Sequence, residues 1–340
     1  MSESSRESVP PQHRAVLASD LIEQVPDDRR PSSGPIAILP ESRPLFENAV
    51  REAGGEVAPL SPETRGLVWL ESRGASELAR TLDDNPQIEW VQLPWAGVDA
   101  FADILARHAD SSLPLWTSAK GAYAQPVAEH ALMLALALLR VIPTRVRARS
   151  WSTVPEGRSL YGLDVVIIGA GGIAVELARL LQPFDVRLTV LRRSDIPFAG
   201  ADRTLTADRL GEVLPTADVV FVAAAKTSGT ADLIGAEELR IMKSSAVLVN
   251  IARGGLIDTD ALTAALAEGA IHGAGLDVTN PEPLPDGHPL WDEPRVIITP
   301  HSADTPDMTG PLLAERLRLN VEAFLDHGRF VGVVDPKAGY

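Results

Sequence analysis

A histidine at the end of a predicted strand is a clear candidate for chemistry in this sequence. In "RVIITPHSADT", residues 295–305, four β-branched, uncharged residues predict a buried strand, and Pro300 ends it. His301 follows directly. An imidazole can donate or accept a proton near neutral pH, so His301 is a candidate general acid or base. The plain alternative is a solvated loop histidine.

Three more polar residues follow predicted strands in the same part of the chain. Arg253 lies in "LVNIARGGLIDTDAL", Asp277 ends the strand in "HGAGLDV", and Glu282 lies between prolines in "NPEPLP". Three prolines, at 281, 283 and 285, hold Glu282 on a stiffened loop. Each of the three could instead be an ordinary surface charge.

A glycine-rich turn occurs earlier, directly after another predicted strand. Within "GAGGIAVELARLL", Gly169, Gly171 and Ala174 fit the spacing G-x-G-x-x-G/A, and a helical pattern follows. The first glycine allows a tight turn, and the second lets the backbone approach a pyrophosphate. We therefore predict a dinucleotide-binding loop that also includes Gly172 and Ile173, in preference to a purely structural turn.

The strand after that helix ends in "LRRSD", at the place where NAD-binding domains present an acid to the ribose hydroxyls. Arg192, Arg193 and Ser194 stand there instead, and guanidinium and hydroxyl groups suit a 2'-phosphate. We predict NADP (NADPH) in preference to NAD. The alternative is a solvated basic loop, with Asp195 serving as a late acid for NAD.

The elements that must position these residues alternate between strand and helix. Strands are expected at 163–169, 186–191, 217–224, 245–251, 271–278 and 295–300, with helical stretches between most of them. This alternation predicts a doubly wound parallel sheet, in which ligands bind at the carboxyl ends of the strands. The glycine loop, Arg253, Asp277 and His301 should therefore meet at one edge.

A second, smaller set of strands precedes this series, at 36–39, 57–60, 67–70 and 89–93. The stretch 126–150 predicts one long apolar helix, and 308–327 predicts a last helix that returns to the first domain. We expect an α/β protein with two Rossmann-like domains, the smaller one flavodoxin-like. The expected boundaries are a disordered leader at 1–33, a substrate domain at 34–117 and 306–340, and a dinucleotide-binding domain at 118–305.

Composition excludes several classes of function. The formal net charge of −15 disfavours nucleic acid and anionic membranes as partners. The absence of cysteine excludes disulfides and thiolate zinc sites, and no metal is expected. The first residues lack the apolar core of a signal peptide, and the longest apolar run, 131–139, is too short to span a bilayer. The expectation is a soluble, cytoplasmic protein.

In this order, the glycine loop, "NIARGG", "GLDVTNPEP" and "TPHSA" resemble the D-isomer-specific 2-hydroxyacid dehydrogenases, a family that includes glyoxylate/hydroxypyruvate reductases and phosphoglycerate dehydrogenases. The resemblance runs from about Trp90 to Asp304. It implies that Arg253 holds the carboxylate and carbonyl of the substrate, and that Glu282 pairs with His301, the acid/base.

The resemblance also extends to other segments. It implies that "PWAGVD" holds the substrate carboxylate through the backbone amides of Gly97 and Val98, and that Asp277 lies near the nicotinamide amide. "GAYAQPVAEHAL" resembles the start of the interdomain helix, on which His130 is expected to be structural. One departure is "AAAKTSGT", which places Lys226 where many members have the leucine of a Pro-Leu-Thr loop.

The function implied is hydride transfer between NAD(P)H and a small 2-oxo acid or 2-hydroxy acid, of the glyoxylate/hydroxypyruvate reductase type, by a homodimer. The alternative is a non-catalytic, dinucleotide-sensing binding protein on the same scaffold. A sensor needs only the cofactor site, so the joint presence of Arg253, Glu282 and His301 argues for the enzyme. A third interpretation is formate or phosphite oxidation on the same scaffold. Formate is disfavoured, because the resemblance implies a Gln rather than a Glu beside the histidine in the formate branch.

Overall fold

A computed structural model of the chain describes residues 22–71, 74–227 and 229–337. It divides into two compact units: unit 1 comprises the chain up to Tyr123 and from Thr305 onward, and unit 2 comprises Ala124–Asp304. Of the predicted leader, residues 1–21 lie outside the described residues. From Ile22 the chain is placed, and its first strand, β1 (Ile22–Gln24), pairs antiparallel with β13 (Arg329–Val331).

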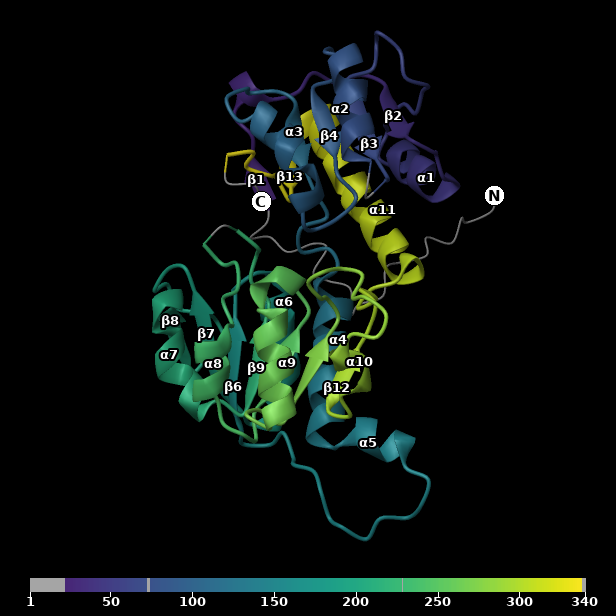
Figure 1. Cartoon of the computed structure of the whole chain (residues 1–340). Helices are drawn as coiled ribbons and strands as arrows, with labels where there is room; N and C mark the ends of the chain where they lie inside the picture. The colour runs from purple at the N-terminus through teal and green to yellow at the C-terminus, as the bar shows by residue number, and fades with distance from the viewer. Residues whose placement is uncertain (1–21, 72–73, 228, 338–340) are drawn as a thin grey trace, which may run out of the picture. The chain divides into compact units, whose positions relative to one another are not determined.

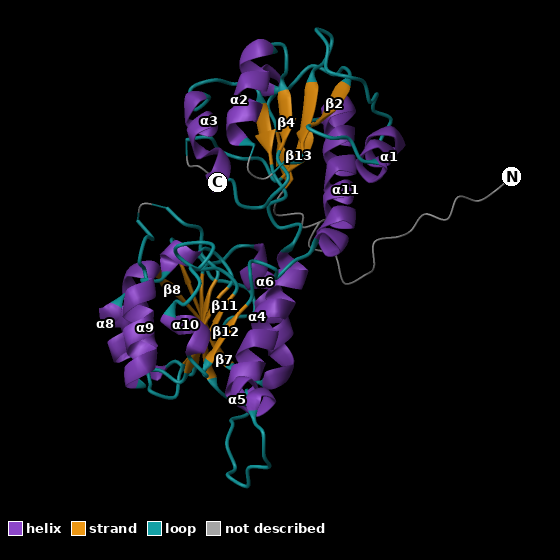
Figure 2. Ribbon diagram, turned by 45° about the vertical axis from the view of Figure 1, so that its right-hand side comes forward, coloured by secondary structure: helices purple, strands orange, loops and turns teal. Residues whose placement is uncertain are grey.

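Unit 2 contains a seven-stranded parallel sheet, drawn in Figures 1 and 2. The chain starts at β6, builds β7 and β8 on one side, and then returns to build the other four strands on the other side. The strand order is β8 (Arg203–Thr206), β7 (Arg187–Arg192), β6 (Asp164–Ile168), β9 (Val219–Val222), β10 (Val247–Asn250), β11 (Gly273–Leu276) and β12 (Val296–Ile298). The predicted doubly wound sheet is confirmed, with the change of direction between β6 and β9. The strand β8 is not among those predicted from the sequence.

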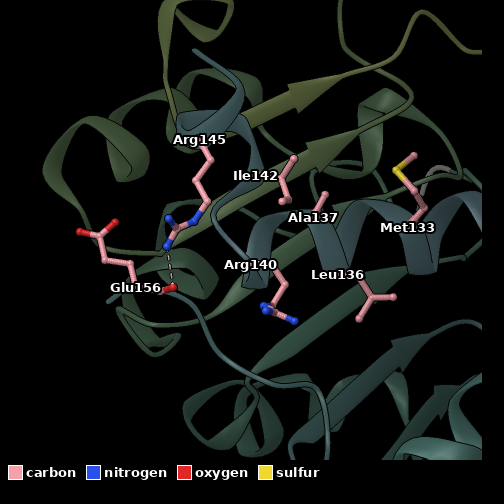
Figure 3. Close-up of a pocket in the computed structure, with 7 residues that line it drawn as sticks. All are labelled: Met133, Leu136, Ala137, Arg140, Ile142, Arg145 and Glu156. Carbon is pink, nitrogen blue, oxygen red and sulfur yellow. Dashed lines mark hydrogen bonds between the residues drawn. The ribbon is translucent and has the colours of Figure 1, made fainter. Parts of the chain in front are cut away.

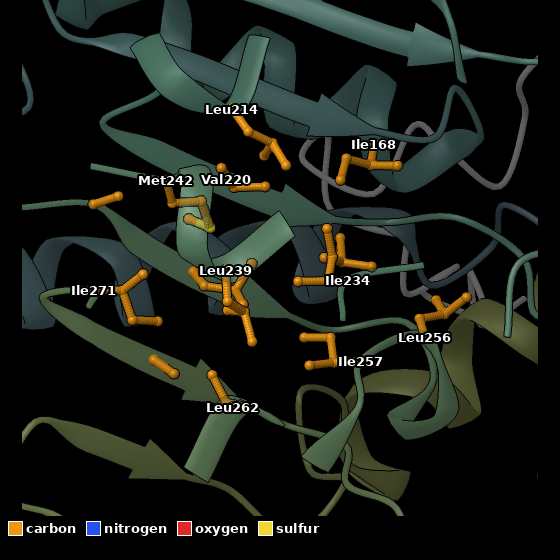
Figure 4. Close-up of a cluster of buried hydrophobic side chains, with 14 of the residues drawn as sticks. Ile168, Leu214, Val220, Ile234, Leu239, Met242, Leu256, Ile257, Leu262 and Ile271 are labelled. Carbon is orange, nitrogen blue, oxygen red and sulfur yellow. The ribbon is translucent and has the colours of Figure 1, made fainter. Parts of the chain in front are cut away.

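Helices cover both faces of this sheet (Figure 2). The helices α4 (Ala124–Leu139) and α6 (Gly172–Leu181) pack together, and α4 also contacts β10 and β11. On the other face, α8 (Ala236–Ile241) packs with α9 (Thr259–Glu268). Figure 4 shows the apolar core beneath α8 and α9, formed by side chains such as Leu239, Leu256 and Leu262. The other helices described in this unit are α5 (Ile142–Arg147), α7 (Leu210–Val213) and α10 (Pro289–Asp292).

The long helix predicted for 126–150 is two helices. The first ends at Leu139, and Val141 takes a left-handed conformation with φ of 57° before α5 begins. Pro143 has no amide hydrogen to donate back along a continuous helix, but it fits the first turn of a new one. The helix α9 is capped by Asp258, whose carboxylate accepts hydrogen bonds from the amides of Asp260 and Ala261.

Unit 1 contains four parallel strands in sequential order: β2 (Ile36–Leu39), β3 (Gly66–Trp69), β4 (Trp90–Gln92) and β5 (Leu115–Thr117). The strand predicted at 57–60 is reduced to one parallel bridge between Val57 and Ile36. This bridge still gives the order 2-1-3-4-5 of a flavodoxin-like sheet. The helices are α1 (Pro44–Glu52), α2 (Ala75–Asp84), α3 (Ala102–Arg107) and α11 (Pro306–Glu322).

The last helix returns to unit 1 as predicted. The helix α11 packs against α1 and ends in a π-helical turn, Ala323–His327. The 3₁₀ turns are Asp27–Arg29, Asp99–Phe101, Gln182–Phe184, Ala207–Arg209, Leu214–Thr216 and Gly254–Leu256. In the part of the chain that the structure describes, no helix has both the length and the apolar character needed to cross a bilayer.

Candidate active site

The predicted polar residues of unit 2 follow the carboxyl ends of neighbouring strands. Gly169 comes directly after β6, Arg253 three residues after β10, Asp277 directly after β11, and His301 three residues after β12. Because all the strands are parallel, these positions lie along one edge of the sheet. This edge is where an open α/β sheet binds its ligands.

His301 and Glu282 form a pair at this edge. The distance from His301 Nδ1 to Glu282 Oε1 is 2.8 Å, and the two side chains are 48% and 44% exposed. With Glu282 accepting at Nδ1, the other ring nitrogen, Nε2, is the one left to exchange a proton with a substrate. The structure therefore brings together the two residues that the sequence places 19 positions apart.

The backbone of His301 is held in an unfavourable conformation. Its φ is 50°, in the left-handed region that costs a residue with a side chain about 1–2 kcal/mol. Its amide donates to the backbone oxygens of Asp277, at 2.8 Å, and Thr299, at 2.9 Å. Such a conformation persists only when its surroundings determine it, and here it accompanies a candidate catalytic group.

The Asp277 carboxylate is buried beneath this turn. Its Oδ1 accepts from the Thr299 hydroxyl at 2.6 Å and the Ser302 amide at 2.9 Å, and its Oδ2 accepts from the Ala303 amide at 3.1 Å. A buried carboxylate needs such donors to replace water. The role predicted for Asp277 beside a nicotinamide stays a prediction, whereas its bonds to the turn that carries His301 were not foreseen.

Two residues near the turn that carries His301, His130 and Asp304, were not predicted to belong to the site. His130 Nε2 lies 2.9 Å from Thr299 Oγ1 and 3.6 Å from Asp277 Oδ1. Burial raises the pKa of the Asp304 carboxyl, and Asp277 raises it further, while charge on His301 acts in the opposite direction. The contact between α4 and the turn after β12 spans 169 residues, so no local sequence signal could have revealed it.

Arg253 lies on a turn that its neighbours shape. The Asn250 side chain accepts from the Ala252 amide at 3.1 Å and donates to the Arg253 carbonyl at 2.9 Å. The guanidinium, which is half-buried, donates to the Ala252 carbonyl at 2.7 Å. The strand-end asparagine therefore acts as a brace that fixes the direction in which the arginine leaves the strand.

Gly254 lets this turn approach the loop that carries Glu282. A Cβ atom at Gly254 would lie 1.8 Å from the backbone oxygen of Thr279, a distance that no side chain can occupy. The next glycine, Gly255, lies against the side chain of Lys226, the residue that departs from the family pattern. A Cβ at Gly255 would be 2.8 Å from Nζ of Lys226. The loops after β9, β10 and β11 are thus in direct contact.

The glycine loop has one closed and one open position. Gly169 has φ of 118°, and a Cβ there would lie 2.4 Å from the Ala223 oxygen, so glycine is required. Gly171 is exposed, and a Cβ there would meet nothing within 4 Å. Gly172 and Ile173 begin α6, whose first amides face the same opening. This empty space before a helix N-terminus fits the pyrophosphate of a dinucleotide.

The predicted 2'-phosphate residues lie at the end of β7. Arg192 is the last residue of this strand, and its Nη1 donates to the Ile196 oxygen at 3.1 Å. Arg193 is exposed, and Ser194 is half-buried. Because β7 is next to β6, the two arginines are one strand away from the glycine loop.

Gly97 and Val98 belong to unit 1, in the loop that follows β4. Gly97 is half-buried and Val98 is buried. The loop is supported by the ring of Tyr123, which packs edge-on against Trp95 and donates from its hydroxyl to the Pro94 oxygen at 2.7 Å. Their role in holding a substrate carboxylate stays a prediction.

A hollow of about 600 Å³ lies in unit 2 (Figure 3), but not at this edge. It is formed by the end of α4, by α5 and by the loop at Glu156, and it is mostly apolar. The end of α4 packs at the start of β11, where a Cβ on Gly273 would touch Leu138. The hollow is therefore at the amino ends of the strands, and none of the predicted site residues lines it.

The chain is similar to known proteins over most of its length. Residues 131–303 match the family model for the NAD binding domain of D-isomer specific 2-hydroxyacid dehydrogenases. An uncharacterized protein from the proB 3' region of Corynebacterium melassecola is 41% identical over 297 residues, which cover 86% of this chain and 95% of that protein. A glyoxylate reductase of Thermofilum pendens is 35% identical over 62% of this chain and 64% of its own length.

Solved structures give the same result for the fold. A D-isomer specific 2-hydroxyacid dehydrogenase from Xanthobacter autotrophicus Py2, solved with NADPH and MES, superposes with a TM-score of 0.74 at 28% identity. The superposition covers 91% of this chain and all of that one. The two-domain α/β architecture expected from the sequence is confirmed.

Proposed function

This chain belongs to the D-isomer specific 2-hydroxyacid dehydrogenase family, NAD(P)-dependent oxidoreductases acting on CH–OH donors, and we propose that it is a glyoxylate/hydroxypyruvate-type reductase. Its substrate would be a small 2-oxo acid, with NADPH as the preferred reductant. The observation that carries the proposal is the pairing of His301 with Glu282 at 2.8 Å, on a loop packed against the Arg253 turn. A dinucleotide-sensing protein would have no use for this arrangement.

The residues of the edge supply what reduction of a keto group requires. Arg253 binds the substrate carboxylate and carbonyl, and its positive charge stabilises the oxygen as it becomes an alkoxide. Protonated His301 donates its Nε2 hydrogen to that oxygen. Glu282 accepts from Nδ1 and keeps the ring in place. The product is the 2-hydroxy acid, and His301 recovers its proton from solvent, to which it is exposed.

A nicotinamide dinucleotide fits the residues that would hold it. The loop from Gly169 to Ile173 leaves open space at Gly171 for a pyrophosphate. When bound, the reduced nicotinamide supplies the hydride. We assign unit 2 to the cofactor and unit 1, through the amides of Gly97 and Val98, to the substrate. Asp277 is proposed to lie near the nicotinamide amide.

The preference for NADPH rests on the end of β7. Arg192 and Arg193 offer two guanidinium groups, and Ser194 a hydroxyl, where an acid would repel a 2'-phosphate. The Xanthobacter relative was solved with NADPH, which supports this assignment.

We also propose a homodimer. Apolar side chains lie exposed on α5 and on the segment that follows it, with Val146 at 73%, Trp151 at 93% and Val154 at 57%. Single exposed apolar residues are common, but a run of them near an apolar hollow marks an association surface. Light scattering should give twice the monomer mass, and Val146→Glu with Trp151→Glu should reduce it to the monomer.

The test of the catalytic proposal is a spectrophotometric panel. Glyoxylate, hydroxypyruvate, pyruvate and bulkier 2-oxo acids are each supplied with NADPH and with NADH, and cofactor oxidation is followed by the loss of absorbance of the reduced nicotinamide. We expect the highest kcat/KM with a small 2-oxo acid and NADPH. Cofactor binding without turnover of any 2-oxo acid would favour the sensor instead.

A further inference from the structure

His130 is joined to the turn that carries His301 by a short series of hydrogen bonds. Thr299 Oγ1 lies 2.9 Å from His130 Nε2 and donates to Asp277 Oδ1 at 2.6 Å. A hydroxyl has only one hydrogen, so Thr299 must accept from His130, and Nε2 of His130 must carry a hydrogen. The direction of donation therefore runs from His130 through Thr299 to the buried carboxylate.

Asp277, which is held by Thr299, in turn forms hydrogen bonds with the backbone of His301 and of the residues after it. Its carboxylate accepts from the amides of Ser302 and Ala303, directly after His301, and its backbone oxygen accepts from the His301 amide. The φ of 50° at His301 must be held by its surroundings, and these bonds are what holds it. If the Asp277 carboxylate rotated, it would lose its hydrogen bonds with the amides of Ser302 and Ala303.

We infer that His130 and Thr299 are positioning residues for His301. Together they fix the rotation of the Asp277 carboxylate, which fixes the turn and so directs the imidazole toward Glu282 and the substrate. Neither residue needs to touch the substrate or the cofactor. The charged groups around His301 are Glu282, Asp277 and Asp304. The inference rests on the proposed function only where its test measures turnover.

The kinetic test uses two matched pairs of variants. Thr299→Val keeps the shape and removes the hydroxyl, whereas Thr299→Ser keeps the hydroxyl. His130→Leu removes the donor, whereas His130→Gln keeps an N–H donor at similar reach. We expect kcat to fall about tenfold or more in the Val and Leu variants, because small misplacements of a catalytic group are costly. The KM for NADPH should be unchanged, and the Ser and Gln variants should recover most of the rate.

A merely structural role predicts a different result. Loss of packing would lower the melting temperature and the rate together, and Ser at 299, which lacks the methyl group, would be no better than Val. Equal loss of kcat in both members of either pair would overturn the inference. Melting temperatures and NADPH titrations of all four variants show whether each is folded when its rate is measured.

A spectroscopic test needs no substrate. In protein labelled with ¹⁵N-histidine, His130 should carry its hydrogen on Nε2, with slow exchange that is lost in Thr299→Val and kept in Thr299→Ser. The ring signals of His301 should shift in the Val variant alone, with His130→Gln and His301→Gln used for assignment. Hydrogen on Nδ1 of His130 alone would overturn the inference. If the predicted spectra are seen but no 2-oxo acid is reduced, the proposed function fails and the positioning network stands.

Discussion

The two halves of the binding edge in unit 2 are built in opposite ways. On the side of β10 to β12, a Cβ at Gly254 would collide with backbone, and the Asp277 carboxylate accepts three hydrogen bonds from its own chain. On the side of β6 and β7, Gly171 faces open space and Arg193 is exposed. One half is closed by internal contacts, and the other is open to a ligand.

This difference separates the two tasks of the site. A proton donor and a carbonyl-polarising arginine work best when they are held in place before the reaction, because no energy is then spent on ordering them. The backbone amides of a cofactor loop can face open space, because the phosphates of the ligand accept hydrogen bonds from them when it binds. Substitutions in the closed half should change rate or stability, and those in the open half should change cofactor binding.

The largest effect should come from Arg253 in the closed half. Arg253→Lys keeps the positive charge but loses the planar fork that holds a carboxylate and a carbonyl together. We expect kcat/KM for the best 2-oxo acid to fall about 100-fold, or roughly 2.7 kcal/mol, with NADPH affinity unchanged. Arg209→Lys, on a surface pair with Glu212, is the control and should be neutral. Full activity in Arg253→Lys would make Arg253 an ordinary surface charge.

The glycines give the most direct contrast between the halves. Gly254→Ala must push apart two loops, so we expect unfolding free energy to drop by about 1–3 kcal/mol. Gly171 has φ of −80°, and a Cβ there would meet nothing within 4 Å. The stability of Gly171→Ala without cofactor should therefore be unchanged, while its affinity for the dinucleotide weakens. Urea denaturation and NADPH titration of both variants measure this. If the two variants lose the same stability and the same NADPH affinity, the two halves of the edge do not differ as described.

The sequence was sufficient for the parts of the fold that depend on local pattern. Short, largely apolar strands between helical stretches predicted the sheet of unit 2, and a strand-turn-helix pattern predicted the loop at Gly169. The position of His301 after β12 followed from the β-branched residues 296–299 and from Pro300, which ends the strand. Two failures also have physical causes. The strand β8 begins with the polar residues Arg203 and Thr204, and Pro59 has no amide hydrogen for a strand at 57–60, of which the structure keeps one bridge at Val57.

The internal bonds of the site could not be predicted in the same way. The contact between His130 and Thr299 depends on how α4 lies against the end of β12, which no spacing along the chain reveals. Likewise, "ARGG" indicated a turn, but not that Gly254 lies against Thr279. Sequence patterns identify which residues reach an edge, whereas the bonds among them depend on tertiary packing.

In the open half, the pair of arginines should set the choice of cofactor. Replacing Arg192 and Arg193 together with Ala should lower kcat/KM for NADPH on the order of tenfold, or about 1.4 kcal/mol, and leave NADH nearly unaffected. Arg179→Ala, which removes a cation paired with Glu176 on α6, controls for the change in net charge. Equal use of NADPH and NADH by the unaltered protein would contradict the assignment before any variant is made.

The smallest effect is expected at the opposite edge of the sheet, where Asp218 precedes β9. Its buried carboxylate accepts from Arg158 at 2.7 Å, from Lys243 at 3.0 Å and from the Asp164 amide at 3.1 Å. Burial by itself would raise the pKa of Asp218, but the hydrogen bonds and the lysine charge outweigh it, and the pKa lies below the usual 3.8. This edge is thus closed like the half that holds His301, but it carries no predicted chemistry.

Asp218→Asn should therefore lower stability and leave kcat unchanged. A pKa that is lower in the folded state than in the unfolded state stabilises the fold above the unfolded value, about 3.9 for Asp, and this contribution is lost as the pH falls through the folded value. We expect a loss of about 1 kcal/mol at pH 7 and a weaker dependence of stability on pH below about 4. Glu212→Gln, in the exposed pair with Arg209, is the matched control and should change stability less, because solvent screens that pair. Urea denaturation of the three proteins between neutral and acidic pH gives the answer. A fall in kcat of Asp218→Asn with stability intact would show that closure by internal contacts serves chemistry at both edges of the sheet.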